Sequence, residues 1–583
     1  MRNSPSIAGI SGPTVIADEM GGCFMQEVVR VGEGKLLGEI IRIDGERAVI
    51  QVYEETFGLK IGDPVARTGE LLSVELGPGL IGSVFDGIQR PLTTLYEQWG
   101  NYIGKGAIVP RLDKTRKWRF IPAVKKGDVV EGGTVIGSVN ETNAIAHRIM
   151  VPHGIAGKIA SIGDGELTIA EPGAVLEDGT GIPLRQRWNI REPRPTAGRL
   201  GFNVPMLTGQ RILDTLLPVA EGGSAIIPGG FGTGKTVLEQ TIAKYASADV
   251  IIYIGCGERG NEMSDVLHQF PRLSDLYTGR PLMERTILIA NTSNMPVAAR
   301  EASIYTGMTI AEYYRDMGLR VAVMADSTSR WAEALREISS RLEEMPGEEG
   351  YPTYLASRLA AFYERAGRFR CQGREKEIGA ITVIGAVSPP GGDFSEPVTQ
   401  ASMRTASTFW ALDYDLAYQR HFPAINWRTS YSLAIPNLSE WFALNAAPNW
   451  GAMVEETNSI LQREEELADI AKVVGMDAMG ERERVEMEAA RLIREGYLRQ
   501  NSAHPADAFC SLPRQVKLLA LFLNYTRAIQ AATHKGCPLE TILNAPMVEP
   551  LLRAKELPET EMDAEIQKLR TEIRDYFGRE WTE

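Results

Sequence analysis

The sequence predicts a multidomain chain with β-rich N-terminal parts, a central α/β domain and a helical C-terminal domain. Three observations support this fold class. The 583 residues correspond to three or four domains at about 150 residues each. The spacing of apolar runs and turn residues changes along the chain, from closely spaced short strands, through alternating strands and helices, to charged helical stretches. The content of 44% hydrophobic and 23% charged residues is typical of globular proteins and excludes global disorder.

The balance of charged, cysteine and apolar residues excludes several protein classes. With 62 basic and 75 acidic residues, the net charge of −13 argues against nucleic-acid binding over the whole surface and favours protein partners or a small anion in a pocket. Five scattered cysteines without CxxC spacing predict neither a disulfide framework nor a zinc site. No signal-like segment is visible, and no apolar run approaches the ~20 residues of a membrane span, so we expect no direct membrane insertion.

Residues 1–75 are expected to form a small β-barrel. Segments 37–43 and 47–53 have strand-like composition and flank Asp44-Gly45, a dipeptide typical of hairpin turns. Short strands at this spacing favour closure into a barrel over an open sheet. Gly77-Pro78-Gly79 then breaks the pattern, and we place the start of the next domain at residue 76.

Residues 110–190 are predicted to form an inserted β-rich bulge domain within the α/β domain, which covers 76–109 and 191–435. The insertion is rich in glycine turns, and Lys126–Val139 is similar to half of a biotinyl/lipoyl-type β-sandwich. Such carriers present a lysine on a hairpin between their halves, but Asn140–His147 contains no lysine. We therefore favour an inserted β module over a carrier function.

The central region alternates strand-like and helix-like stretches. Lys235–Tyr245 and Trp331–Glu344 are helix-like. Five strand-like runs surround them: Ser224–Ile227, Asp249–Ile254, Thr286–Ala290, Arg320–Ala325 and Ala380–Ala386. This alternation predicts a parallel sheet covered by helices on both faces. Strand signals then fade, and residues 436–583 are predicted to form an amphipathic helical domain that presents surfaces to partner chains.

The sharpest signal is the stretch Gly229-Gly230-Phe231-Gly232-Thr233-Gly234-Lys235-Thr236, which satisfies the phosphate-loop pattern GxxxxGK(S/T). Its glycines allow backbone N–H groups to converge on phosphates, and the following helix points its positive N-terminal end at the same anion. Lys235 is expected to reach the β- and γ-phosphates, and the Thr236 hydroxyl to coordinate Mg²⁺. An apolar strand before the loop and a helix after it are the context that this motif requires.

Two acidic residues near strand ends are candidates for the rest of the site. Asp326 closes the strand 320–325 and is expected to bind the metal, because ligands of open α/β sheets bind at that edge. Taken alone, it fits a helix N-cap or turn residue as well. Glu258 follows the strand 249–254 and is expected to polarise the attacking water, with Arg259 beside it to hold the γ-phosphate. By spacing alone, a solvated ion pair is an equally good interpretation.

At these residues the sequence resembles one family. The phosphate loop and the runs Gly255–Met263, Ile289–Ser303 and Met324–Glu333 are similar to those of the catalytic A subunit (alpha chain) of vacuolar/archaeal-type (V/A-type) rotary ATPases. The similarity runs nearly end to end and includes Val387–Asp393 and His421–Trp427. The insertion also fits, since this subunit type carries a bulge there, whereas its non-catalytic companion lacks a working phosphate loop.

The resemblance implies a RecA-like domain that hydrolyses or synthesises ATP and couples this reaction to central-stalk rotation and to H⁺ or Na⁺ transport across a membrane. The implied cofactors are ATP or ADP and Mg²⁺. The implied partners are the non-catalytic B subunit in an alternating three-plus-three ring, the central-stalk and peripheral-stalk subunits and the membrane-embedded ion-translocating sector, without nucleic acid. The implied location is cytoplasmic, at a membrane through the complex, and an arginine finger would come from the neighbouring subunit.

The site residues of the family carry over onto matching positions of this sequence. Catalytic roles fall to Lys235, Glu258 and Arg259, and Mg²⁺ binding to Thr236 and Asp326. The residues implied in nucleotide binding are Gly229, Gly230, Phe231, Gly232, Thr233, Gly234, Lys235, Thr236, Val237, Phe422 and Gln500. Among these, Phe422 is implied as an aromatic side chain of the adenine pocket.

Three positions depart from the family pattern. Gly230 stands where the family usually has proline, which predicts a more flexible loop before the nucleotide binds. Ala503 stands where relatives commonly have an aromatic residue, and the loss of a stacking ring is expected to cost about 1 kcal/mol of adenine binding. Thr233 replaces the cysteine of eukaryotic members, so no disulfide switch is expected at the loop.

Two other function classes stay open at this point. A related homo-oligomeric ring ATPase motor that translocates protein or nucleic acid shares the barrel and the phosphate-loop domain. The acidic charge and the lack of a basic, aromatic-rich channel segment count against nucleic acid, and the insertion and the helical C-terminus count against both substrates. A regulatory nucleotide-binding subunit without turnover is disfavoured because Lys235, Glu258 and Asp326 are intact.

Overall fold

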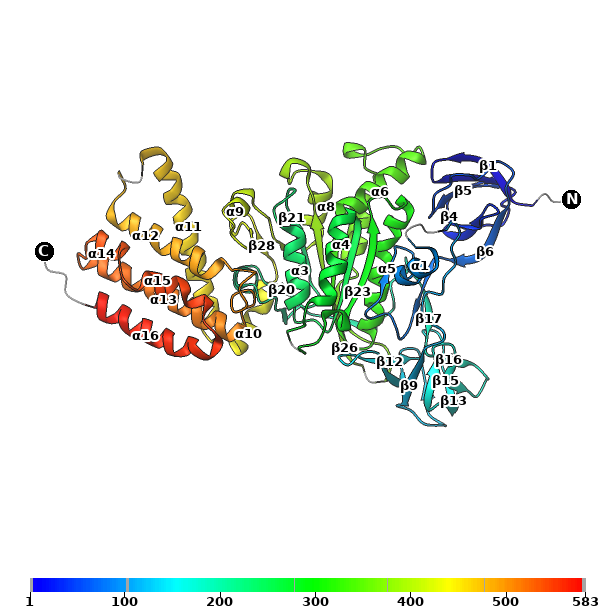
Figure 1. The fold of residues 1–583 in the computed structure, drawn as a ribbon, viewed down its shortest axis with the longest axis horizontal. Coiled ribbons are helices and arrows are strands. Elements are labelled where there is room, and N and C mark those ends of the chain that lie inside the picture. Colours follow the sequence, from blue (N-terminus) through cyan, green and yellow to red (C-terminus); the bar gives the residue numbers. More distant parts are fainter. Residues whose placement is uncertain (1–3, 101–103, 277, 375, 476–477, 579–583) are drawn as a thin grey trace. The chain divides into compact units, whose positions relative to one another are not determined.

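The computed structural model describes residues 4–100, 104–276, 278–374, 376–475 and 478–578 (Figure 1). The chain divides into two compact units. One consists of Met1–Gly201, Glu221–Ile226 and Ala248–Ala406, and the other of Phe202–Ala220, Ile227–Ser247 and Ser407–Glu583. In the described parts of the chain, no helix combines the length and the apolar composition that crossing a bilayer requires.

The first unit begins with the predicted β-barrel. Its strands are β1 (Ser6–Ser11), β2 (Thr14–Asp18), β3 (Glu27–Val31), β4 (Leu36–Asp44), β5 (Arg47–Val52) and β6 (Val65–Leu71), in the order β1-β2-β5-β4-β3-β6. A bridge between Ser6 and Pro64 brings the first and last strands together. Gly45 adopts φ 62° in the turn between β4 and β5, a conformation that glycine adopts readily. Ile40 and Ile50 lie opposite each other on these two strands and are fully buried in the barrel core.

The insertion consists of two four-stranded antiparallel sheets. Their strands are β9 (Lys117–Pro122), β10 (Val129–Val130), β11 (Val135–Asn140), β12 (Ala146–Met150), β13 (Gly157–Ile162), β14 (Gly165–Thr168), β15 (Pro172–Leu176) and β16 (Gly181–Pro183). The sheet orders are β10-β13-β15-β16 and β12-β11-β9-β14. A β-carbon at Gly137 would collide with the ring of Phe120, so glycine at this position leaves the room that the fully buried ring occupies.

The segment Asn140–His147, where a carrier would present its lysine, docks the insertion on the rest of the unit. The Glu141 carboxylate accepts hydrogen bonds from two backbone N–H groups outside the insertion (2.7 and 3.0 Å) and from the Tyr314 hydroxyl (2.9 Å). The two ring nitrogens of His147 contact Glu141 (2.6 Å) and the Tyr313 hydroxyl (2.9 Å). All of these side chains are buried, so the hairpin serves attachment within the chain.

The α/β part of the first unit is built on parallel strands. They are β8 (Val84–Phe85), β21 (Ser224–Pro228), β22 (Val250–Glu258), β23 (Thr286–Thr292), β24 (Arg320–Asp326) and β26 (Ile378–Val387), in the order β21-β26-β24-β22-β23-β8. The pairs from β26 to β8 are parallel. Helices α4 (Gly260–Gln269), α5 (Val297–Asp316) and α6 (Thr328–Arg341) pack against these strands (Figure 1). This confirms the α/β architecture that the alternation of patterns predicted.

Two element boundaries differ from the predictions. The helix expected at Trp331–Glu344 is α6, which begins earlier, at Thr328, because Ser327 has the extended conformation of an N-cap residue and ends the preceding strand connection. The strand expected to end at Ile254 continues to Glu258, because β22 stays paired with β23 to that residue after an irregularity in register. Glu258 is therefore the last residue of a strand and not part of the loop that follows it.

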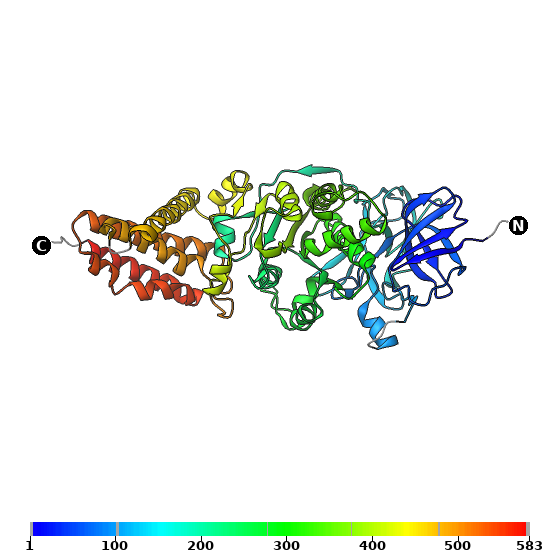
Figure 2. The same ribbon diagram turned by 90° about the horizontal axis from the view of Figure 1, so that it is seen from above.

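The second unit consists mainly of helices, as expected for the C-terminal region. They are α2 (Arg211–Leu216), α3 (Lys235–Tyr245), α9 (Tyr414–Tyr418), α10 (Ile435–Asn445), α11 (Trp450–Val474), α12 (Glu481–Leu492), α13 (Leu512–His534), α14 (Leu539–Leu543), α15 (Val548–Arg553) and α16 (Glu559–Phe577). The long helices α11, α12, α13 and α16 pack side by side, as Figures 1 and 2 show. Leu518, Leu519 and Phe522 on α13 are buried between them.

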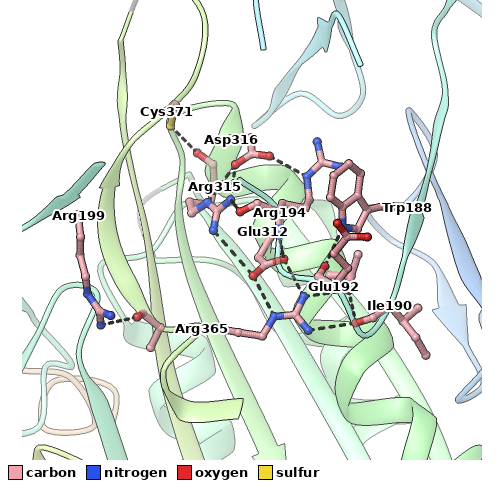
Figure 3. A network of polar contacts seen from close by, with 12 residues as sticks. Trp188, Ile190, Glu192, Arg194, Arg199, Glu312, Arg315, Asp316, Arg365 and Cys371 are labelled. Carbon is pink, nitrogen blue, oxygen red and sulfur yellow. Dashed lines mark hydrogen bonds and ion pairs between the residues drawn. The ribbon is translucent and has the colours of Figure 1, made fainter. Parts of the chain in front are cut away.

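Within the first unit, buried ion pairs tie α5 to the segment that leaves the insertion (Figure 3). Arg194 donates to Asp316 at 2.7 Å, and Arg315 donates to the same carboxylate. Arg365 donates to both carboxylate oxygens of Glu312 at 2.9 and 2.7 Å. Burial alone would raise the pKa of Asp316, but the charges of Arg315 and Arg194 hold this pKa well below its usual range. The network fixes the position of α5, the helix that follows β23.

Replacing Asp316 by Ala is expected to destabilise the first unit by about 3–5 kcal/mol, because two buried arginines lose their carboxylate. Urea-induced unfolding followed by tryptophan fluorescence measures the loss. Asp164→Ala is the matched control, since Asp164 lies exposed in the insertion and a surface change of this kind stays within about 0.5 kcal/mol. Equal unfolding midpoints for the two variants would contradict the role assigned to the network.

Candidate nucleotide site

The phosphate loop leads from the end of β21 into α3 in the second unit. Helix α3 begins at Lys235, as predicted. Gly232 and Gly234 adopt φ values of 82° and 92°, which side chains with a β-carbon rarely adopt. Left-handed residues in a loop of this kind form a concave arrangement of backbone N–H groups, and the N-terminus of α3 follows directly. The local backbone is therefore that of an anion-binding loop.

The ammonium group of Lys235 is held by the loop itself. Its Nζ donates to the carbonyl oxygens of Gly229 (2.6 Å) and Gly230 (2.9 Å). The Thr233 hydroxyl donates to the same Gly230 oxygen at 2.8 Å. The positive charge therefore stays at the N-terminal end of α3, where the helix dipole also favours an anion.

A cavity of about 820 Å³ lies beside the loop, within the second unit. This volume suits a ligand of nucleotide size. Its walls come from the loop and α3, from residues 412–424, from residues 495–502 and from residues 549–556. Of the residues expected to bind the nucleotide, those that line the cavity are Gly232, Thr233, Gly234, Val237, Phe422 and Gln500.

Gln500 supports the cavity wall through hydrogen bonds that use its side-chain amide. The amide oxygen accepts from the Arg211 N–H at 2.6 Å, and Nε2 donates to the Asp507 carbonyl at 2.8 Å. The backbone N–H of Gln500 donates to the Phe422 carbonyl at 2.7 Å, so the two residues form a bridge. Gln500 therefore positions Phe422, a role that the family pattern alone did not indicate.

A buried ion pair holds the same wall from behind. Arg211 donates to Asp507 at 2.7 Å, and both side chains are fully buried. Arg211 also donates to the carbonyl oxygens of Tyr497 and Arg499, while the second Asp507 oxygen accepts from the Asn501 N–H at 2.7 Å. The pair therefore anchors this segment to α2. Sequence reasoning missed it because its two members are 296 residues apart and no motif spacing links them.

Lys555 supports the far side of the cavity. Its Nζ donates to the carbonyl oxygens of Glu495 (2.6 Å) and Arg499 (2.9 Å). Burial lowers the pKa of Lys555 to about 8. Near neutral pH the ammonium keeps its proton and can compensate the carbonyl oxygens at the end of the helical turn Ile493–Leu498.

In the first unit, Glu258 and Asp326 end neighbouring parallel strands. Strands β22 and β24 pair with Gly255 opposite Asp326, so both carboxyl groups lie at the C-terminal edge of the sheet, where α/β proteins bind ligands. The Tyr253 hydroxyl donates to the buried Asp326 carboxylate at 3.0 Å. The placement of Asp326 at the end of a strand is as predicted.

The Glu258 carboxyl titrates far from its ordinary range. Burial, the negative charge of Asp326 and a hydrogen bond with Glu262 raise the pKa of Glu258 to about 8, against the positive charge of Arg330. A pKa near the working pH suits a group that accepts or holds a proton during a reaction. Sequence reasoning did not single out Arg330, and Arg259 is the exposed residue that precedes α4.

The donors expected for Mg²⁺ are the Asp326 carboxylate and the Thr236 hydroxyl. Both are hard oxygen ligands of the type that Mg²⁺ prefers. Mg²⁺ usually keeps several waters and is bound by one or two carboxylates together with substrate phosphates. One carboxylate and one hydroxyl therefore fit an ion that is shared with a nucleotide.

Comparisons with known proteins identify the family. The model of the ATP synthase alpha/beta family nucleotide-binding domain matches residues 209–432, and that of the β-barrel domain of this family matches 7–69. The barrel-sandwich domain of the same family matches 109–191, and the C-terminal domain of V and A type ATP synthase matches 439–539. The chain is 55% identical to a V-type ATP synthase alpha chain of Anaeromyxobacter dehalogenans over 576 residues, which covers 99% of both chains. The chain belongs to the V/A-type ATP synthase alpha-chain family.

Other relatives in this family come from archaea. An A-type ATP synthase catalytic-type chain of Methanospirillum hungatei, the second A subunit of that organism, is 56% identical over 94% of both chains. The corresponding A-type ATP synthase chain of Methanopyrus kandleri is 54% identical over 98% of this chain and 97% of its own. As a member of this nucleotide-binding family, the chain binds ATP or ADP.

Among solved structures, the assembled ATPase EscN of the enteropathogenic E. coli type III secretion system has a TM-score of 0.64 and covers 89% of this chain and 100% of its own. Its sequence is only 21% identical, so this likeness concerns the fold alone. The ring motor considered from the sequence is therefore a distant relative of this V/A-type alpha chain.

Replacing Glu258 by Gln is expected to stabilise the nucleotide-free chain by an amount that grows with pH. The folded-state pKa of about 8 lies far above the value of about 4.3 of an unfolded glutamate. Between these values the unfolded state binds fewer protons, so the wild type loses folding free energy as pH rises, whereas neutral Gln does not.

Thermal unfolding at about pH 5, 7 and 9 measures this difference, which should increase to about pH 8 and then level off. Glu364→Gln is the matched control, because Glu364 lies exposed in the same unit, and its effect should be small and independent of pH. A Glu258→Gln effect that is equal at all three pH values would contradict the assigned pKa.

Proposed function

We propose that this chain is the catalytic subunit of a V/A-type rotary ATPase, which hydrolyses or forms ATP and couples this reaction to central-stalk rotation and to H⁺ or Na⁺ transport. The observation that carries the proposal is the phosphate loop, in which Lys235 is held beside a cavity of nucleotide size. Its support comes from relatives that are V-type and A-type ATP synthase chains over nearly their full length.

In this proposal the second unit binds the nucleotide. The N–H groups of the loop and the Lys235 ammonium neutralise the β- and γ-phosphates, and Lys235 exchanges its carbonyl acceptors for phosphate oxygens. Phe422 packs against the adenine, and Val237 closes the cavity beside the loop. Gln500 and the Arg211–Asp507 pair act by holding Phe422 and its neighbours in place.

The first unit supplies the groups that act on water and phosphate. Glu258 orients and polarises the attacking water, for which its pKa near neutrality is suited. Arg259 contacts the γ-phosphate. Asp326 and Thr236 would hold Mg²⁺, which supplies charge neutralisation to the transferring phosphoryl group. Catalysis in this scheme is positioning together with charge stabilisation.

The proposed partners are the non-catalytic B subunit, the central-stalk and peripheral-stalk subunits and the membrane-embedded ion-translocating sector, and the proposed location is the cytoplasmic side of a membrane. The proposed domains are 1–75, 76–109 with 191–435, 110–190 and 436–583. The end of β6 at Leu71, the strands between residues 117 and 189 and the start of α10 at Ile435 support these boundaries.

Mg-ATP hydrolysis, measured first with this chain alone and then with an equal amount of the B subunit, tests the proposal. We expect a gain of about tenfold or more on mixing, because an arginine supplied by a neighbouring subunit stabilises the transition state strongly. Lys235→Ala should abolish activity in the mixture and weaken nucleotide binding by the chain. Equal activity with and without the B subunit would favour the homo-oligomeric motor instead.

A further inference from the structure

Residues 412–414 run directly along the start of the phosphate loop. The backbone N–H of Leu412 donates to the Pro228 carbonyl at 2.9 Å. A β-carbon added to Gly229 would lie only 2.8 Å from the Leu412 β-carbon, so the two segments are in close van der Waals contact. Within the second unit, this segment is therefore a wall of the loop that precedes Lys235.

The side chain of Tyr414 occupies the space beside the next loop residue. Its hydroxyl lies where a β-carbon of residue 230 would be, and the adjoining ring carbon also lies too close for such a β-carbon. Gly230 does not have the positive φ that Gly232 and Gly234 have. Glycine at position 230 is therefore required for space, to admit Tyr414, and not for its backbone conformation.

The peptide that Tyr414 contacts is one that holds the loop lysine. The Gly230 carbonyl oxygen accepts hydrogen bonds from Lys235 Nζ at 2.9 Å and from the Thr233 hydroxyl at 2.8 Å. A shift of Gly230 would move both donors. Contact with Tyr414 on one side of this residue therefore limits where the Lys235 ammonium can rest.

The position of Tyr414 is itself fixed by its neighbours. Asp413 is the N-cap of α9, and its carboxylate accepts from the backbone N–H groups of Asp415 (2.8 Å) and Leu416 (3.1 Å). The second carboxylate oxygen accepts from the Asn426 side chain at 2.8 Å. The backbone of Tyr414 is thus anchored, while its side chain remains 42% exposed and can be altered without opening the core.

We propose that Tyr414 is a positioning residue for the phosphate loop, which packs on Gly230 and thereby keeps the Lys235 ammonium in place for the nucleotide phosphates. The proposal rests on the proposed function, in which this loop binds ATP. It also explains the glycine at position 230, because a residue with a β-carbon and Tyr414 compete for the same space.

A double-mutant cycle with Gly230→Ala and Tyr414→Ala tests this role, with the dissociation constant of a fluorescent ATP analogue as the readout. Gly230→Ala alone should weaken binding about twofold or more, because the new methyl group displaces Tyr414 and the loop. In the Tyr414→Ala background the same change should have a clearly smaller effect. In the Tyr414→Phe background the penalty should persist, because the ring remains.

The matched control is Tyr418→Ala on the same helix, where the side chain is 87% exposed, and binding should stay at the wild-type value. Unchanged thermal unfolding of all variants shows that the readout is nucleotide binding and not loss of fold. Additive effects of Gly230→Ala and Tyr414→Ala would overturn the role of Tyr414 and leave the proposed function intact. Absence of analogue binding by the wild type would overturn both.

Discussion

The hydrogen bonds from Lys235 to the carbonyl oxygens of Gly229 and Gly230 are the interactions on which the nucleotide site depends. A lysine side chain has a flexible stem of four carbons and loses considerable conformational freedom when it is fixed. Carbonyl acceptors in the same loop restrict its charge to the end of α3 before any phosphate arrives. Since both acceptor residues lack a β-carbon, residues 412–414 can pack directly on them. Lysine position, loop composition and the neighbouring segment therefore depend on one another.

Each of the two units uses buried ion pairs to fix a segment that carries functional groups. Arg211 and Asp507 anchor the segment that contains Gln500 and, through it, Phe422. In the first unit, Arg194 and Asp316 attach α5 to the chain that leaves the insertion (Figure 3). Buried ion pairs cost desolvation free energy, and their net contribution to stability is small when both partners are present. Here their hydrogen bonds to several backbone groups give them a positioning role.

Local patterns were sufficient to predict much of the fold. The hairpin around Gly45, the start of α3 at Lys235 and the end of β24 at Asp326 follow from turn residues, a phosphate-loop pattern and an apolar run, all of which act within a few residues. The extension of β22 to Glu258 was not predictable, because it depends on pairing with β23. Helix α6 was placed too late for a similar reason, since its first turn lacks an apolar stripe in the sequence.

The parts of the site that were not predictable depend on contacts between distant segments. The pairing of Arg211 with Asp507, the support of a carbonyl by Lys555 and the packing of Tyr414 on Gly230 leave no spacing signal, because the residues involved meet only after folding. The raised pKa of Glu258 is of the same kind, since it results from burial and from Asp326 and Glu262 around it. Residue type and family resemblance indicated which residues matter, but not which neighbours set their properties.

The most direct test of the account is the comparison of Mg-ATP binding and turnover in Glu258→Gln and in the wild type, both assembled with the B subunit. The account predicts a dissociation constant within about threefold of the wild type, because the loop that binds the phosphates is unchanged. It predicts that turnover falls by about 100-fold or more, since the group that polarises the water is lost. Comparable turnover in the two assemblies would contradict the central claim that Glu258 acts on the water while the loop around Lys235 binds the nucleotide.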